Sequence, residues 1–137
     1  MQKTKSQRNH YLIIALILLF YFAITLFRLN QLPVFADEAI YIRWTQLIID
    51  DWQRYLFFPM NDGKTPLQMW LMIPFQFIFK NQLFAGRFLS VLVGAGNVVL
   101  IGLISKEMTA GDRQKKFSQY IAMILTSILP FTFFHHL

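Results

Sequence analysis

The sequence predicts an all-helical membrane protein that crosses the bilayer about three times. Residues of the set AVILMFWYC make up 55% of the 137 residues, while charged residues make up only 15%. This balance is too apolar for an ordinary soluble domain. The 15 phenylalanines stand partly in dense runs that would leave large apolar patches exposed to water. A lipid bilayer is therefore the solvent that this composition fits.

The first predicted crossing covers residues 11–29. Its central part, Tyr11–Phe27, contains no charged residue, and about 20 apolar residues are needed to span the ~30 Å hydrocarbon core. Basic residues precede this run and no small-residue cleavage pattern follows it. We therefore expect an uncleaved anchor with residues 1–10 in the cytoplasm.

Two further crossings are predicted at residues 88–105 and 117–134, both free of charge. The loop between them, residues 106–116, is short and strongly basic, so the positive-inside rule places it in the cytoplasm. The chain then leaves the cytoplasm again, and residues 135–137 lie outside. The two histidines in this last stretch are adjacent and cannot both face one site from a regular helix, so no metal site is predicted there.

This arrangement leaves residues 30–87 as one segment outside the membrane. Residues 66–79 are apolar but short and contain Pro74, and runs of about 10–14 apolar residues are more often interfacial or re-entrant than spanning. Another amphipathic helix is predicted at about residues 37–56, because large apolar residues recur there in steps of three and four. These residues are Ile40, Trp44, Leu47, Ile48, Trp52 and Tyr55. Asn61–Gly63 has the composition of a tight turn between the two helices.

Two adjacent carboxylates, Asp37 and Glu38, stand in the first turn of the earlier helix. Their ordinary role would be to stabilise the helix start, where the dipole favours anions. The alternative role is catalytic, because a carboxylate at the outer leaflet can accept a proton from an attacking hydroxyl or amine.

Two cations follow later in the segment. Lys64 comes directly after Gly63, and Arg87 stands at the predicted outer mouth of the second crossing. Either could simply anchor the chain at the lipid headgroups. Either could also contact a phosphate, and the arginine could instead orient a carboxylate. We group Tyr41 with these cations as a third candidate for donor binding.

The order of these features resembles the start of a known enzyme family. The matching sequence runs from an apolar helix through Asp37–Tyr41, an amphipathic helix, Gly63–Leu67 with Trp70, and Gly86-Arg87 before a glycine-bearing span. It is similar to the glycosyltransferase family that includes protein O-mannosyltransferases and the aminoarabinose transferase acting on lipid A. The resemblance extends from about Leu12 to Leu137.

The resemblance implies the N-terminal part of a GT-C fold and inverting transfer of a sugar. The family's catalytic carboxylate corresponds to Asp37, with Glu38 beside it, and its phosphate-binding cations correspond to Lys64 and Arg87. Thr65 stands where the family's lysine motif commonly has proline, which loosens that turn. Because such enzymes continue through many more helices, the resemblance also implies that this chain is a fragment, inactive by itself.

The partners implied are a polyprenyl-phosphate-linked sugar and a lipid, glycan or protein acceptor, at the outer side of the plasma or inner membrane. No cofactor is implied, although a divalent cation is compatible with the site. The net charge of +6 is scattered between apolar spans, so no nucleic-acid partner is expected. With no cysteine in the chain, disulfides and thiolate metal sites are excluded.

Two interpretations from other functional classes stay open. One is a small membrane scaffold or assembly subunit whose outside segment binds a partner. The other is half of a transporter, but the predicted spans lack the intramembrane charges and broken helices expected along a transport path.

Overall fold

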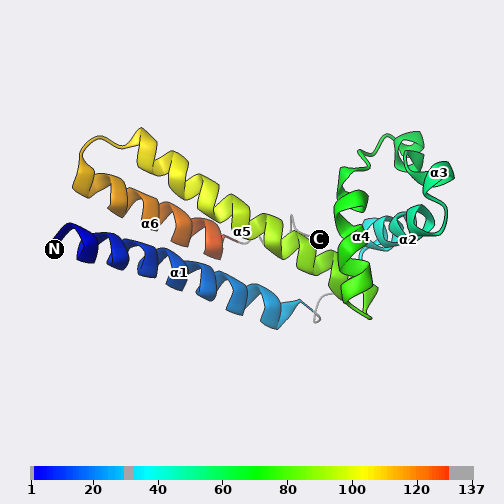
Figure 1. Cartoon of the computed structure of the whole chain (residues 1–137), viewed down its shortest axis with the longest axis horizontal. Coiled ribbons are helices and arrows are strands. Elements are labelled where there is room, and N and C mark those ends of the chain that lie inside the picture. The colour runs from blue at the N-terminus through cyan, green and yellow to red at the C-terminus, as the bar shows by residue number, and fades with distance from the viewer. Residues whose placement is uncertain (1, 30–32, 130–137) are drawn as a thin grey trace. The chain divides into compact units, whose positions relative to one another are not determined.

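The computed structural model describes residues 2–29 and 33–129, and all regular structure in these residues is helical (Figure 1). The elements are α1 (Gln2–Arg28), α2 (Ala36–Asp50), α3 (Trp52–Tyr55), the 3-10 helix η1 (Phe58–Asp62), α4 (Leu67–Ile78), α5 (Gln82–Met108) and α6 (Asp112–Ile128). They divide into two compact units. The bundle unit holds α1, α6 and α5 from Val91 onward, and the α2–α4 unit holds residues 29–90.

Two helices in the described residues are long and apolar enough to cross a membrane. They are Gln7–Phe27 within α1 and the whole of α5. In their most apolar windows only 11% and 28% of the residues are buried by protein. Most of their apolar side chains therefore need another apolar environment, which a bilayer provides.

The predicted second and third crossings correspond only in part to helices of the structure. The second crossing, residues 88–105, lies inside α5, which begins six residues earlier at Gln82. The third was predicted at residues 117–134, and α6 covers it up to Ile128. Its last residues, together with residues 135–137, lie outside the described part of the chain.

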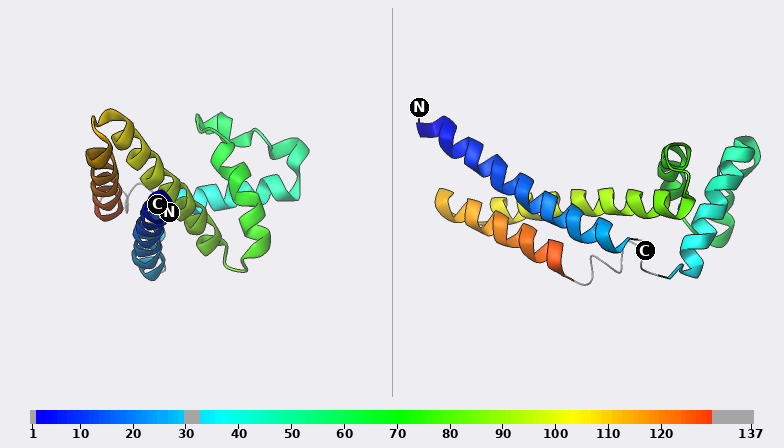
Figure 2. Two further views of the ribbon diagram at one scale, coloured as in Figure 1. Left: turned by 60° about the vertical axis from the view of Figure 1, so that its left-hand side comes forward. Right: turned by 90° about the horizontal axis from the view of Figure 1, so that it is seen from below.

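In the bundle unit, α1, α6 and the later part of α5 lie side by side (Figures 1 and 2). The loop between α5 and α6 is only three residues long, so the two helices run antiparallel. The hydroxyl groups of Ser105 and Ser118 are 2.6 Å apart across this pair. On α1, the buried Tyr21 hydroxyl donates a hydrogen bond to the Val91 carbonyl of α5 at 3.2 Å. Polar contacts thus join helices whose outer faces are apolar.

In the α2–α4 unit, α2 packs against α4 through a small apolar core. Ile48 of α2 and Met69 and Met72 of α4 are its buried members, each at most 3% exposed. The Thr45 hydroxyl lies 3.6 Å from the sulfur of Met72. This core sets the position of α2, whose first turn carries the predicted carboxylates.

The helix predicted at residues 37–56 is not continuous. It is divided at Asp51, where the backbone leaves the helical region with φ −147° and ψ 87°. The Asp51 carboxylate then accepts a hydrogen bond from the backbone N–H of Arg54 at 3.2 Å and caps α3. Asp50 and Asp51 stand at the end of α2, where the helix dipole disfavours negative charge, while an aspartate is well suited to starting a new helix.

Candidate functional site

The best-defined polar contact of the α2–α4 unit joins Glu38 to Arg87. The Arg87 Nε donates to Glu38 Oε1 at 2.6 Å, and its NH2 group donates to Oε2 at 2.9 Å. This two-point geometry matches the flat guanidinium to the flat carboxylate. The ion pair is also buried, because Arg87 is only 1% exposed and Glu38 only 6%.

Arg87 also holds the chain that enters α2. Its guanidinium donates to the carbonyl of Leu29 and, at 3.1 Å, to the carbonyl of Pro33. One side chain in the second turn of α5 thereby connects the end of the first predicted crossing with the start of α2. The cost of burying the charge is offset by these four hydrogen bonds, which leave the guanidinium well satisfied.

Two sequence predictions concern these residues. Arg87 was expected to bind a phosphate, but its donors are occupied by Glu38 and two carbonyl groups, and it is buried. Glu38 was expected beside a catalytic carboxylate, and its oxygens face Arg87 instead. Both roles predicted for Arg87, binding a phosphate and orienting a carboxylate, stay predictions.

Asp37 lies in a different environment from its neighbour. It is exposed in the first turn of α2. The Lys64 ammonium lies 5.7 Å from the centre of the Tyr41 ring, which is one helical turn after Asp37. The hydrogen bond to Tyr41 raises the pKa of Lys64, and the charges of Tyr41 and Asp37 raise it further. Asp37, Tyr41 and Lys64 therefore lie near one another, with Asp37 exposed and the other two half-buried, and we call these three residues the Asp37 cluster.

The local backbone explains how Lys64 reaches α2. Gly63 ends η1 in the left-handed region with φ +70°, a conformation that suits glycine. The Lys64 N–H then donates to the carbonyl of Pro59 at 3.1 Å and closes the turn. The tight turn predicted at Asn61–Gly63 is confirmed.

The five predicted site residues thus separate into two sets within one unit. The first set is the Asp37 cluster, whose predicted catalytic and donor-binding roles stay predictions. Glu38 and Arg87 form the buried pair beneath the first turn of α2. Because Asp37 and Glu38 are consecutive, the buried pair fixes the backbone that carries the exposed carboxylate.

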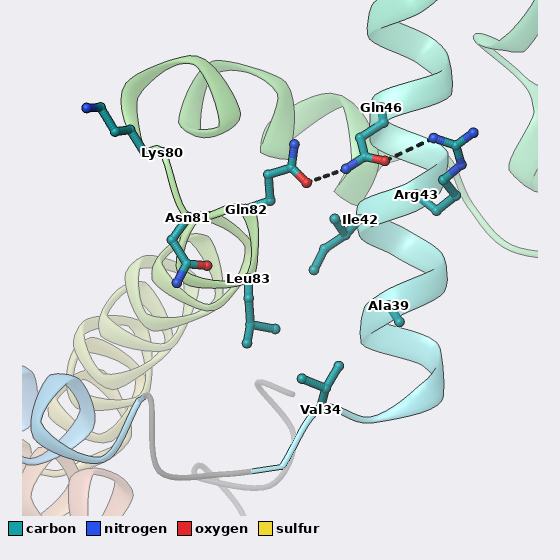
Figure 3. Close-up of a pocket in the computed structure, with 9 residues that line it drawn as sticks. All are labelled: Val34, Ala39, Ile42, Arg43, Gln46, Lys80, Asn81, Gln82 and Leu83. Atoms are coloured by element: carbon teal, nitrogen blue, oxygen red, sulfur yellow. Dashed lines mark hydrogen bonds between the residues drawn. The ribbon is translucent and has the colours of Figure 1, made fainter.

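The same unit contains an open pocket of about 480 Å³ on another face of α2 (Figure 3). It is lined by Val34, Ala39, Ile42, Arg43, Gln46, Lys80, Asn81, Gln82 and Leu83. None of the predicted site residues lines it. The sequence contains only a weak signal for this pocket. Arg43 and Gln46 are three residues apart on a helix, and Lys80–Gln82 is a short polar stretch before an apolar one.

In the described residues, no group of three or more histidine, aspartate or glutamate side chains is arranged to hold a metal ion. Comparison with known proteins identifies no relative: no protein family, no curated protein and no solved structure matches this chain.

Proposed function

We propose that the protein is a membrane glycosyltransferase that moves a sugar from a polyprenyl-phosphate donor to a lipid, glycan or protein acceptor. The observation that carries the proposal is the Asp37 cluster, in which an exposed carboxylate lies near the half-buried ammonium group of Lys64. Two apolar helices that suit a bilayer adjoin this unit in the sequence. Transfer of a sugar from a lipid phosphate requires a carboxylate that accepts a proton and a cation that stabilises the leaving phosphate, both at the membrane surface.

In the proposed reaction, an oxygen or nitrogen of the acceptor attacks the anomeric carbon of the sugar. Asp37 accepts the proton of that nucleophile as the new bond forms. The bond between the anomeric carbon and the phosphate oxygen breaks, and the lipid phosphate leaves with the bonding electrons. A single displacement of this kind inverts the configuration at the anomeric carbon.

Lys64 has the role of stabilising the negative charge of the departing phosphate. A lysine is protonated at neutral pH, and the hydrogen bond to Tyr41, followed by the nearby negative charges, raises the pKa of Lys64 further. Tyr41 positions this ammonium. Arg87 and Glu38 are positioning residues in this mechanism, because they hold the start of α2 without reaching its surface.

The location proposed for the site is the outer membrane surface, with the GT-C arrangement and α6 as a third crossing. In favour of an interfacial position, α4 is only 12 residues long, which gives about 18 Å at ~1.5 Å per residue and is too short to span the bilayer. It also exposes a set of large apolar side chains, Leu67, Leu71, Phe77 and Ile78. Such a helix is suited to lying in the headgroup region.

The test is Asp37→Asn in the full-length protein in its native membranes, assayed with radiolabelled polyprenyl-phosphate sugars. Loss of a general base lowers the rate by roughly 100-fold to 10,000-fold, and we expect a loss in this range with unchanged membrane insertion. The matched control is Asp50→Asn, an exposed aspartate at the other end of α2, which should keep full activity. Undiminished turnover in Asp37→Asn would remove the catalytic assignment and favour a scaffold.

A further inference from the structure

The open pocket beside α2 has two chemically different parts. Its apolar part is formed by Val34, Ala39, Ile42 and Leu83. Figure 3 shows the Ile42 and Leu83 side chains extending from α2 and α5 into the space between these helices. The volume of about 480 Å³ is in the range of ~300–1,000 Å³ typical of small-molecule sites. An apolar floor of this kind suits the first carbons of an acyl or alkyl chain.

The polar part of the pocket is rich in hydrogen-bond donors. The Arg43 NH1 group donates to Gln46 Oε1 at 3.2 Å, and the Gln46 amide donates to Gln82 Oε1 across the pocket (Figure 3). Asn81 uses its side-chain oxygen to cap the start of α5 by accepting from the Phe84 N–H at 3.1 Å. Its amide nitrogen carries donor hydrogens as well. A ligand with several acceptor oxygens matches this edge.

The charge of the lining is positive. Arg43 and Lys80 are its two cations, and none of its nine residues is acidic. They stand at opposite sides of the pocket, and both side chains are exposed. Their heads turn outward in Figure 3, but both side chains have long flexible stems that can turn toward a bound anion. The pocket therefore favours an anion with an apolar tail over a neutral molecule.

We propose that this pocket binds the phosphate headgroup of an anionic membrane lipid, with Arg43 and Lys80 on the phosphate and the apolar floor on the first carbons of the lipid. Arginine recognises phosphate oxygens in two-point contacts, and basic pockets at a membrane surface select anionic headgroups. The site is separate from the Asp37 cluster, and its function does not depend on glycosyl transfer. Its role is to hold the α2–α4 unit against anionic lipid.

The test measures lipid binding to the complete purified chain by native mass spectrometry in a non-ionic detergent. Three probes are titrated separately: dioctanoyl phosphatidate, dioctanoyl phosphatidylcholine and inorganic phosphate. We expect saturable binding of phosphatidate that is at least ~10-fold tighter than binding of either other probe, a difference of about 1.4 kcal/mol. Equal binding of phosphatidylcholine or of inorganic phosphate would overturn the proposal, because the site would then not require an anionic headgroup joined to a tail.

Two variants locate the binding in this pocket. Arg43→Gln combined with Lys80→Gln removes both cations, and Ala39→Phe fills the pocket without changing the charge. Each should weaken phosphatidate binding at least ~10-fold. The control for charge is Arg8→Gln combined with Arg54→Gln, which removes two exposed cations elsewhere and should leave binding unchanged. If the control loses as much binding as the pocket variants, or if Ala39→Phe binds normally, the site is not this pocket.

Discussion

At the residue scale, the buried Glu38–Arg87 pair is the contact on which the candidate site depends most. A buried ion pair is not automatically stabilising, because both charges lose their hydration. Here the guanidinium also satisfies the carbonyl groups of Leu29 and Pro33. Removing it would leave a buried carboxylate and two carbonyl groups without their donor, so the single variants should be costly.

We predict that Arg87→Ala destabilises the protein by about 3–5 kcal/mol, the range for breaking a buried pair by removing one partner. Glu38→Ala should also destabilise, because it leaves the buried arginine without its counter-charge. The measurement is denaturant unfolding in detergent micelles, followed by circular dichroism. Arg54→Ala is the control, since this exposed arginine of α3 should change stability by no more than about 0.5 kcal/mol.

The double variant Glu38→Ala, Arg87→Ala completes the cycle. If the two side chains stabilise the fold through each other, the double variant should cost much less than the sum of the two single variants. Additive losses would show that the contact contributes nothing as a pair. Such a result would leave the first turn of α2 without its proposed anchor.

At the element scale, the close contact between α5 and α6 depends on one glycine. A Cβ atom on Gly102 would lie 2.5 Å from Met123 Cγ and 2.9 Å from its sulfur. Met123 is fully buried, so it has little room to move. Small residues at helix contacts are typical of membrane bundles, where close packing replaces the hydrophobic driving force.

We predict that Gly102→Ala destabilises the bundle unit by about 1–3 kcal/mol, the usual cost of overpacking. Gly96→Ala is the matched control in the same helix, because a Cβ there meets no atom within 4 Å. That control should be neutral or slightly stabilising, since alanine favours helix more than glycine does. The measurement is the same unfolding assay, and equal effects of the two changes would contradict the packing shown here.

The helical elements could be predicted from sequence with good success, because their signals are local. Charge-free apolar runs and steps of three and four residues indicate helices without knowledge of their neighbours. The division at Asp51 was missed, although its signal was also local: two adjacent aspartates stand inside the predicted helix, and the second one can cap a new turn. The apolar pattern continued across that break and concealed it.

At the scale of the whole molecule, the decisive property is the orientation of the chain in the membrane. The chain has no cysteine, so a single introduced cysteine is a unique label. Gly63 and Gly111 both have positive φ and would be strained by any other residue. Their exposed neighbours Asn61 and Ala110 are therefore the better positions.

We predict that Asn61→Cys reacts with an impermeant maleimide added to intact cells and that Ala110→Cys reacts only after permeabilisation. The reason is that, in the proposed topology, the basic loop after α5 stays in the cytoplasm and α4 lies at the interface without crossing. Labelling of both positions from outside would mean that α4 and α5 both cross. The opposite pattern would place the Asp37 cluster on the cytoplasmic side and exclude the proposed reaction there.

The sequence by itself determined that the described chain is helical and that a turn lies at Gly63, because these properties depend on residues close together in the chain. It predicted three crossings, and two helices of the described residues are long and apolar enough to span a membrane. Only the tertiary structure shows that Arg87 pairs with Glu38. Those two residues are 49 positions apart, and no local sequence pattern predicts which acidic side chain will pair with a buried arginine. The same reason applies to the pocket, whose lining combines α2 with the start of α5. Spacing along the chain predicts elements, whereas the pairing of buried charges depends on how those elements pack.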